Sequence, residues 1–376
     1  LTVMVASFRG SVTQWLDAVL PSPLYVRSAL STSGTTGTEA ALLPAGFAEA
    51  VAQLPGVERV QPLRASPVQL SPTLPALAVL SRPLGDNPAQ SLPLVGEPLS
   101  VPAGRTGVYI SEAVVDLYGV RPGMEWPALS ESFRPFARDG HTQAAIFYIA
   151  GVWRDYARQS GAVALDRAAW LHLTGDARTS DLALWPREGT DTAALQAAIR
   201  TLAATHAGHA AGAGAGDNGE ALVEFASSGA IRDRSLRIFD RSFAVTYWLQ
   251  AVAIAIGLFG VAASFSAQVL ARRKEFGLLA HLGLTRRQIL TVVAGEGAAW
   301  TAVGAAAGVL LGLAVSVVLV HVVNPQSFHW TMDLAVPGGR LLGLCAAVVV
   351  SGTVTAWLAG RAAAGRDAVM AVKEDW

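Results

Sequence analysis

The chain has 376 residues, of which 52% are hydrophobic and only 15% charged, and its formal net charge at pH 7 is zero. Its mean hydropathy of +0.40 is too high for an ordinary soluble protein of this length, and the charge balance excludes nucleic-acid binding through a basic surface. The single cysteine, Cys345, excludes a disulfide within the chain and a C-x-x-C metal or redox motif. These values indicate a membrane protein.

Residues 1–20 predict a helix, because apolar residues recur at helical spacing between Phe8 and Val19 before Pro21 ends the pattern. The chain starts at Leu1 with an apolar stretch and no charged leader. We therefore expect residues 1–20 to be the end of a preceding membrane helix that continues as a stalk, and the chain to be a piece of a longer protein.

Residues 21–227 mix apolar residues with proline, glycine and charged residues, as in a domain surrounded by water. Short β-like runs predict strands at residues 57–63, 76–80, 107–110, 145–153, 162–165 and 181–184. Helical patterns predict helices at residues 111–118, 167–173 and 192–205, the first with Ser111 as its N-cap. Residues 228–242 predict a second helical stalk. We expect an α+β domain on two helical stalks.

Residues 207–219 are almost entirely glycine and alanine, which predicts a flexible loop. This segment lacks the lysine and the serine or threonine that a P-loop needs to bind phosphate. His206 and His209 lie three residues apart at its edge, but the sequence offers no convincing third ligand, so we expect no metal site.

Three apolar runs predict an all-α transmembrane domain at residues 243–376. Their expected spans are residues 243–270, 289–323 and 341–359. The connection at residues 271–288 holds five basic residues against one acid, Glu275, whereas the connection after span two holds Asp333 and no Lys or Arg before Gly339. The positive-inside rule makes residues 271–288 and the tail, residues 360–376, cytoplasmic. The domain at residues 21–227 is then extracytoplasmic.

Two features of span two are candidates for function. Gly304, Gly308 and Gly312 place a small residue at every fourth position, which favours close approach of another helix. That interface either moves during a transport cycle or is a static helix contact. Glu296 lies about two turns inside the span, where an unpaired carboxylate is costly. It is either a gating or coupling residue, or a side chain that snorkels or accepts hydrogen bonds from a neighbouring helix.

The sequence holds no catalytic motif that we can identify. It lacks the P-loop pattern for ATP hydrolysis and the G-x-S-x-G pattern of a nucleophile elbow. The cluster of Arg154, Asp155, Tyr156 and Arg158 is expected to be a solvated turn with a structural Arg–Asp pair.

The segment ARRKEFGLLAHLGLTRRQ, residues 271–288, resembles the cytoplasmic connection of FtsX-like, MacB-type ABC transporter permeases. The shared pattern is a basic pair, a glutamate, an apolar pair, a glycine after a short helix, then a threonine with basic residues that opens the next span. The resemblance continues through Glu296 and the glycine stripe to the tail ending VKEDW, and more loosely through GVYISEAVVDLYGVRPG and IAGVWRDYARQSGAVALDRAAW upstream.

The resemblance implies that a separate ABC-type ATPase subunit binds ATP and Mg²⁺, that this chain itself holds no cofactor, and that a second permease copy or related half completes the assembly. Residues 273–283 would form a coupling helix that docks into the ATPase. Membrane lipids would be a further partner of the chain. The implied coupling residues are Arg272, Arg273, Glu275, Phe276, Gly277, Leu279, His281, Leu282 and Gly283. The alternative is an amphipathic helix that lies on anionic lipid.

We therefore expect a multi-pass permease of the cell (inner) membrane that exports a hydrophobic cargo, or extracts it from the membrane, by mechanotransmission. The cargo would be a lipid, lipoprotein, peptide or drug. Two alternatives are a mechanical regulator of an extracytoplasmic partner, such as a cell-wall hydrolase, and a membrane-anchored receptor. In each case the chain itself is not an enzyme.

Overall fold

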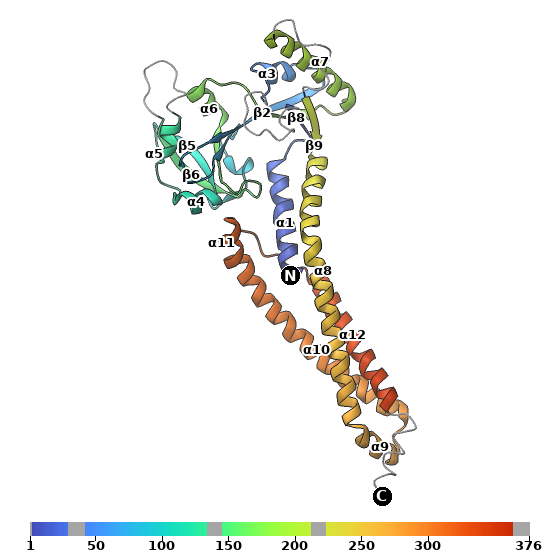
Figure 1. Cartoon of the computed structure of the whole chain (residues 1–376). Coiled ribbons are helices and arrows are strands. Elements are labelled where there is room, and N and C mark those ends of the chain that lie inside the picture. Colours follow the sequence, from blue (N-terminus) through green and yellow to red (C-terminus); the bar gives the residue numbers. More distant parts are fainter. Residues whose placement is uncertain (1, 29–41, 134–144, 212–222, 364–376) are drawn as a thin grey trace. The chain divides into compact units, whose positions relative to one another are not determined.

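The computed structural model describes residues 2–28, 42–133, 145–211 and 223–363 (Figure 1). It divides into two compact units. One, here called the sheet domain, comprises Ser11–Arg237 and Asn324–Thr331. The other, here called the helical domain, comprises Leu1–Gly10, Ile238–Val323 and Met332–Trp376. The predicted division at residues 20 and 228 differs from this one, because the ends of both stalk helices and a short segment between the last two spans belong with the sheet.

The sheet domain is built on a mixed sheet, whose described strands lie in the order β4-β6-β5-β7-β3-β2-β8-β1-β9. β5 pairs with β6 and β3 with β7 in parallel, and the other neighbours are antiparallel. The strands are β1 Leu24–Ser28, β2 Val57–Val68, β3 Leu77–Arg82, β4 Leu94–Val95, β5 Thr106–Ser111, β6 Phe147–Trp153, β7 Ala162–Asp166, β8 Asp181–Pro186 and β9 Val223–Ser227. All six strands predicted from the sequence are confirmed, with longer bounds for most, whereas β1, β4 and β9 were not predicted.

Helices cover this sheet over separate hydrophobic cores. Phe47 of α3 and Ile199 of α7 pack with Leu182 and Leu184 of β8 in one core. The second core contains Trp126, Phe133, Phe147 and Trp170, and Phe133 contacts both Phe147 and Trp170 edge-on or tilted. The short helices of this domain are α3 Phe47–Ala52, η2 Pro88–Gln90, α4 Glu112–Tyr118, α5 Pro127–Ser132 and α6 Arg167–Thr174, and the longer one is α7 Thr192–Ala211.

Three local predictions need correction. α7 continues to Ala211, so the predicted loop at residues 207–219 starts as helix, and its remainder from residue 212 lies outside the described residues. Ser111 precedes α4, but its hydroxyl accepts a hydrogen bond from the Ala162 amide instead of capping the helix. Asp155 pairs with Arg158 at 3.0 Å as predicted, yet its side chain is fully buried, so this turn is not simply solvated.

The helical domain confirms the expected all-α membrane architecture. α1 Thr2–Val19 and α8 Ser228–Ala271 are long helices, and α8 runs without a break from the predicted stalk into the predicted span (Figure 1). Phe8 packs edge-on against Phe239 and Phe243, with ring centroids 5.1 and 5.2 Å away, and Arg9 pairs with Asp240 at 3.4 Å. Near the end of the predicted second stalk, α8 therefore packs on α1.

Within the part of the chain that the structure describes, three helices are long and apolar enough to cross a membrane: Phe243–Ala271, Arg286–Phe328 and Gly338–Arg361. The second is longer than the predicted residues 289–323, since α10 Arg286–Val318 continues through a π-helical turn, Leu319–Val323, into α11 Asn324–Phe328. Pro325 lacks an amide proton and its ring crowds the carbonyl four residues earlier, which the wider π turn accommodates. α12 Gly338–Ala363 forms the third span.

Small residues let α10 and α12 approach closely. A Cβ atom added to Gly352 would lie 2.2 Å from Thr301 Cγ2, and one added to Gly297 would lie 2.5 Å from the Ala356 Cβ. The Thr301 hydroxyl donates to the Gly297 carbonyl at 2.6 Å, so this polar group needs no partner in the lipid. This close contact is a tight small-residue interface of the kind found between membrane helices.

Candidate functional site

The turn between α8 and α10 is organised around one arginine. Arg272 directly follows α8, and α9 Arg273–His281 begins at the next residue. Its Nε donates to Glu275 Oε2 at 2.8 Å, and its Nη1 lies 3.0 and 2.8 Å from the two carboxylate oxygens of Glu296. One guanidinium thus connects the end of α8, the first turn of α9 and the interior of α10.

The pKa of Arg272 is raised above its ordinary value, first by the hydrogen bond to Glu275 and then by the hydrogen bond to Glu296. The arginine is therefore charged at any physiological pH. It also lies over the Phe276 ring, with its Cζ 5.8 Å from the ring centroid.

The contact with Arg272 favours one of the two predicted interpretations of Glu296. This carboxylate accepts hydrogen bonds from a residue at the end of the neighbouring helix, which offsets the cost of placing it within a span. A coupling role for Glu296 stays a prediction, because a hydrogen bond at rest does not show whether the bond changes during a cycle.

α9 turns part of its predicted docking surface inward. Phe276 is only 5% exposed and packs with Val269, Ile289 and Val293, with Leu279 against the same cluster. Gly277 is also buried. In this arrangement Phe276, Gly277 and Leu279 face the spans, and their part in coupling to an ATPase stays a prediction.

Other coupling residues remain available at the surface. Leu278 and Leu282 are 63% and 70% exposed, and Glu275 is also exposed. Arg273 and His281 form the two ends of α9, which is all that the structure describes of them. The exposed apolar surface of the turn is therefore carried by Leu278 and Leu282.

The exit from α9 is fixed by local chemistry. Gly283 has φ of +93°, a backbone conformation that residues with a Cβ rarely adopt, although nothing lies within 4 Å of a Cβ built there. Thr285 then caps α10 by a capping box: its hydroxyl accepts from the Gln288 amide, and the Gln288 side chain accepts from the Thr285 amide. These two features define where the turn ends.

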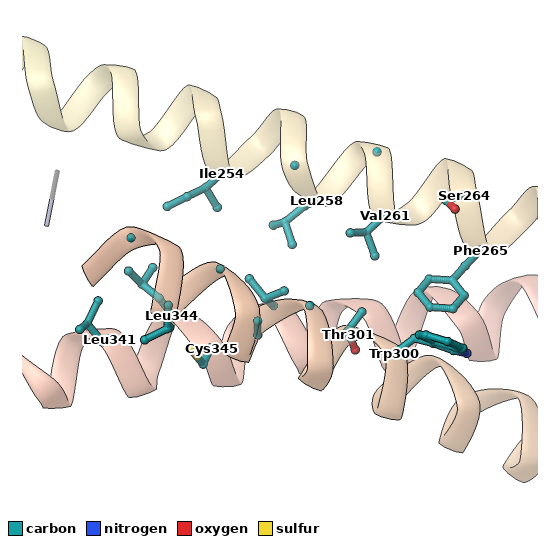
Figure 2. Close-up of a pocket in the computed structure, with 18 of the residues that line it drawn as sticks. Ile254, Leu258, Val261, Ser264, Phe265, Trp300, Thr301, Leu341, Leu344 and Cys345 are labelled. Carbon is teal, nitrogen blue, oxygen red and sulfur yellow. The ribbon is translucent and has the colours of Figure 1, made fainter. Parts of the chain in front are cut away.

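A groove of about 1190 Å³ lies between α8, α10 and α12. The side chains of Ile254, Leu258 and Val261 point from α8 into it, opposite Leu344 of α12 (Figure 2). Arg272 and Glu296 also line the groove. The groove is therefore mainly apolar, with a paired charge among its lining residues.

The glycine stripe of α10 lines this groove. No atom lies within 4 Å of a Cβ built at Gly304, Gly308 or Gly312, so within the described residues the stripe contacts no neighbouring helix closely. The close helix contacts are instead made at Gly297 and Gly352, which we did not single out from the sequence. A role of the stripe in helix packing, static or moving, stays a prediction about a helix that this structure does not contain.

Among the described residues, no group of three or more His, Cys, Asp or Glu side chains lies close enough together to hold a metal ion. His206 Nδ1 lies 3.1 Å from the Leu202 carbonyl of its own helix, and the side chain of His209 lies outside the described residues. Among the described side chains of the turn and groove, Arg272 pairs with both Glu275 and Glu296.

Comparison with known families assigns the helical part of the chain. Residues 249–368, which contain the turn, the groove and all of α10 and α12, match the family described as FtsX-like permease C-terminal. The chain carries an FtsX-like permease domain. The resemblance expected from residues 271–288 is thereby confirmed.

One similar protein is an ABC transporter permease protein of Mycobacterium tuberculosis (strain ATCC 25618 / H37Rv). It is 27% identical to this chain over 372 residues, an alignment that covers 96% of this chain and 40% of the relative. The chain thus spans less than half the length of this relative.

Two solved structures also show some likeness. The periplasmic region of MacB from Actinobacillus actinomycetemcomitans aligns at 11% identity with a TM-score of 0.37, over 58% of this chain and 94% of that one. The extracellular domain of the noncanonic ABC-type transporter YknZ from Gram-positive bacteria aligns at 10% identity with a TM-score of 0.33, over 54% of this chain and 99% of that one. With these scores, neither likeness supports an inference about function.

Proposed function

We propose that this chain is the permease subunit of an ABC transporter, which couples ATP hydrolysis by a separate ATPase subunit to the export or membrane extraction of a hydrophobic cargo. The family match at residues 249–368 and the three apolar helices support a membrane permease. ATP and Mg²⁺ would be bound by the ATPase, and the chain itself would be neither an enzyme nor the holder of a cofactor.

The observation that carries the proposal is the turn formed by Arg272 and α9. Two leucines are exposed here: Leu278 on α9 and Leu282 in the turn that follows it. The first residues of α9 are tied to α8 and α10 through Arg272. An apolar anchor with nearby charges is the kind of surface that a protein partner recognises. Because Arg272 reaches both neighbouring helices, force applied to α9 would be passed to two spans at once.

The direction of insertion follows from charge. The basic turn would be cytoplasmic and the sheet domain extracytoplasmic, as the positive-inside rule requires. The cargo is proposed to be apolar because the groove between the spans is lined largely by apolar side chains. A second permease copy or related half and surrounding lipid would complete the groove.

A charge placed on the exposed apolar surface of α9 tests this proposal. The full chain would be reconstituted in lipid nanodiscs with the ATPase encoded beside it, and ATPase stimulation by the permease measured. Burying a polar group without a hydrogen bond costs about 1–3 kcal/mol, and an ionised carboxylate costs more, so Leu282→Glu should lower the affinity for the ATPase about tenfold or more. Leu99→Glu is the matched control, since Leu99 is an exposed leucine of the sheet domain.

Two results would count against the proposal. If the wild-type chain binds no ATPase, the permease function is wrong. If Leu282→Glu binds and stimulates the ATPase as the wild type does, α9 is not the docking helix, and its amphipathic surface would be assigned to lipid instead.

A further inference from the structure

The short segment that joins the last two spans, Asn324–Thr331, belongs to the sheet domain's unit although its neighbours in sequence are membrane helices. It contains α11 and ends in three residues, His329, Trp330 and Thr331, that contact the sheet domain. From the sequence this region is expected to be only a connecting loop without lysine or arginine.

The amide, the hydroxyl and the carbonyl of Thr331 each make a hydrogen bond to the sheet domain. Its amide donates to Glu112 Oε2 at 2.8 Å and its hydroxyl donates to Glu112 Oε1 at 2.6 Å. Its carbonyl accepts a hydrogen bond from the Tyr156 hydroxyl at 3.0 Å. The two carboxylate oxygens of Glu112 therefore each bind a different group of one residue.

α4 presents a second carboxylate to the same segment. Asp116 lies one helical turn after Glu112, and its Oδ2 is 3.1 Å from His329 Nδ1. Residues four apart on a helix face the same way, so α4 meets His329 and Thr331 with one face. His329 has φ of +58°, an uncommon conformation for a residue other than glycine, which sets the direction of the two residues that follow.

Aromatic packing completes the contact. Trp330 is 6% exposed, and its ring lies edge-on to Tyr156 with centroids 4.7 Å apart. Tyr156 in turn packs on Trp15 of α1 at 5.8 Å. The buried Asn324 side chain donates to the Trp330 carbonyl at 2.8 Å and so closes the segment on itself.

We infer that Asn324–Thr331 is a latch, by which the connection between the last two spans is attached to the sheet domain through Glu112 and Tyr156. The contacts of this segment are hydrogen bonds and aromatic packing, so the latch can open without any covalent bond being broken. The preceding π-helical turn, Leu319–Val323, gives α10 a place to bend when the latch opens.

The attachment itself does not depend on the proposed transport function. A role for the latch in passing movement from the spans to the sheet domain does rest on that function. The two statements are therefore tested by separate measurements on the same full-length chain.

Hydrogen exchange of the full chain in nanodiscs tests the attachment. Glu112→Ala removes both acceptors of Thr331, and should speed exchange of peptides covering residues 324–331 about tenfold or more, as expected when a docked segment opens locally. Glu112→Gln should stay close to the wild type, because its carbonyl accepts from the Thr331 amide and its amide can donate to the Thr331 hydroxyl. Glu97→Ala, a change at an exposed glutamate of the same domain, should have no effect.

A second variant separates loss of the latch contact from a general folding defect. Thr331→Val keeps the amide and removes only the hydroxyl, so it should give a smaller increase in the same peptides while strands β5–β7 keep wild-type protection. Unchanged exchange in both Glu112→Ala and Thr331→Val, with those strands protected, would overturn the latch.

The role in transmission is read from ATPase stimulation by the same variants. We expect Glu112→Ala to lower stimulation at least fivefold and Glu112→Gln to retain it. Full stimulation by Glu112→Ala, with its latch segment exchanging freely, would remove the transmission role. Absence of stimulation by the wild type would instead refute the proposed function, while hydrogen exchange still decides whether the latch exists.

Discussion

At the scale of single residues, the main finding is that Glu296 and Glu112 each have a specific partner. Glu296 accepts from Arg272, and Glu112 accepts from Thr331. Hydropathy and spacing placed Glu296 inside a span but could not name Arg272 as its partner, because the two are 24 residues apart and meet only once α8 and α10 lie side by side. The latch was missed for the same reason, since its partners are 219 residues apart.

The first residue-scale prediction concerns the Arg272–Glu296 contact. A hydrogen bond between charged groups contributes about 1.5–3 kcal/mol, so Glu296→Ala should lower ATPase stimulation about tenfold if the contact passes force to α10. Glu296→Gln, which keeps one acceptor for Arg272, should lie between Ala and the wild type. Glu97→Ala is the control. Wild-type stimulation by Glu296→Ala would show that this contact has no part in coupling.

The second residue-scale prediction concerns pH. Burial raises the pKa of Glu112, and the hydrogen bonds from Thr331 oppose that effect without cancelling it. The folded protein therefore holds this proton more tightly than the unfolded chain, so the contribution of Glu112 to the free energy of unfolding is largest below its ordinary pKa and is lost as pH rises through its raised pKa.

Chemical unfolding of the full chain in detergent, followed by circular dichroism, measures this effect. Glu112→Gln cannot titrate, so the difference in free energy of unfolding between the wild type and Glu112→Gln should fall as pH rises through that window and then become constant. A difference that grows with pH would mean that the Thr331 hydrogen bonds dominate and that the pKa is lowered.

At the scale of elements, patterns that repeat along the sequence were the most informative. Runs of β-branched and apolar residues predicted β2, β3, β5, β6, β7 and β8, and long apolar runs predicted the three spans. The strands that were missed carry weak signals: β4 has two residues, β1 follows two prolines, and β9 lies just after the glycine-rich segment. Their place in the sheet is set by neighbouring strands more than by their own residues.

The orientation of α9 shows what a sequence pattern leaves open. Its leucines and Phe276 indicate an amphipathic helix, and the pattern alone does not say whether the apolar side meets the chain's own spans or a partner. In the structure Phe276 and Leu279 pack on α10 residues and Leu278 and Leu282 face outward. The docking role stays a prediction, and its test uses Leu282, one of the two outward-facing leucines.

The glycines of the spans also show what a sequence pattern leaves open. The regular stripe at Gly304, Gly308 and Gly312 was conspicuous in the sequence, yet it lines an open groove. Gly297 and Gly352 form the close contact between α10 and α12 without any repeat to mark them. Spacing shows that close approach is possible, and only the packing shows where it occurs.

At the scale of the whole molecule, one chain contains an FtsX-like permease domain and a sheet domain. We propose that the turn around Arg272 meets an ATPase in the cytoplasm while the sheet domain works on the other side of the membrane. Each coupling role proposed for α9, Glu296 and the latch depends on this arrangement.

Cysteine labelling in intact cells that express the full protein tests that claim most directly. In a Cys345→Ala background, Leu99→Cys on the sheet domain and Leu282→Cys in the turn after α9 each place one thiol at an exposed position. We expect a membrane-impermeant maleimide to label Leu99→Cys in intact cells and to label Leu282→Cys only after the cells are permeabilised. Labelling of Leu282→Cys from outside, with Leu99→Cys protected until permeabilisation, would contradict it.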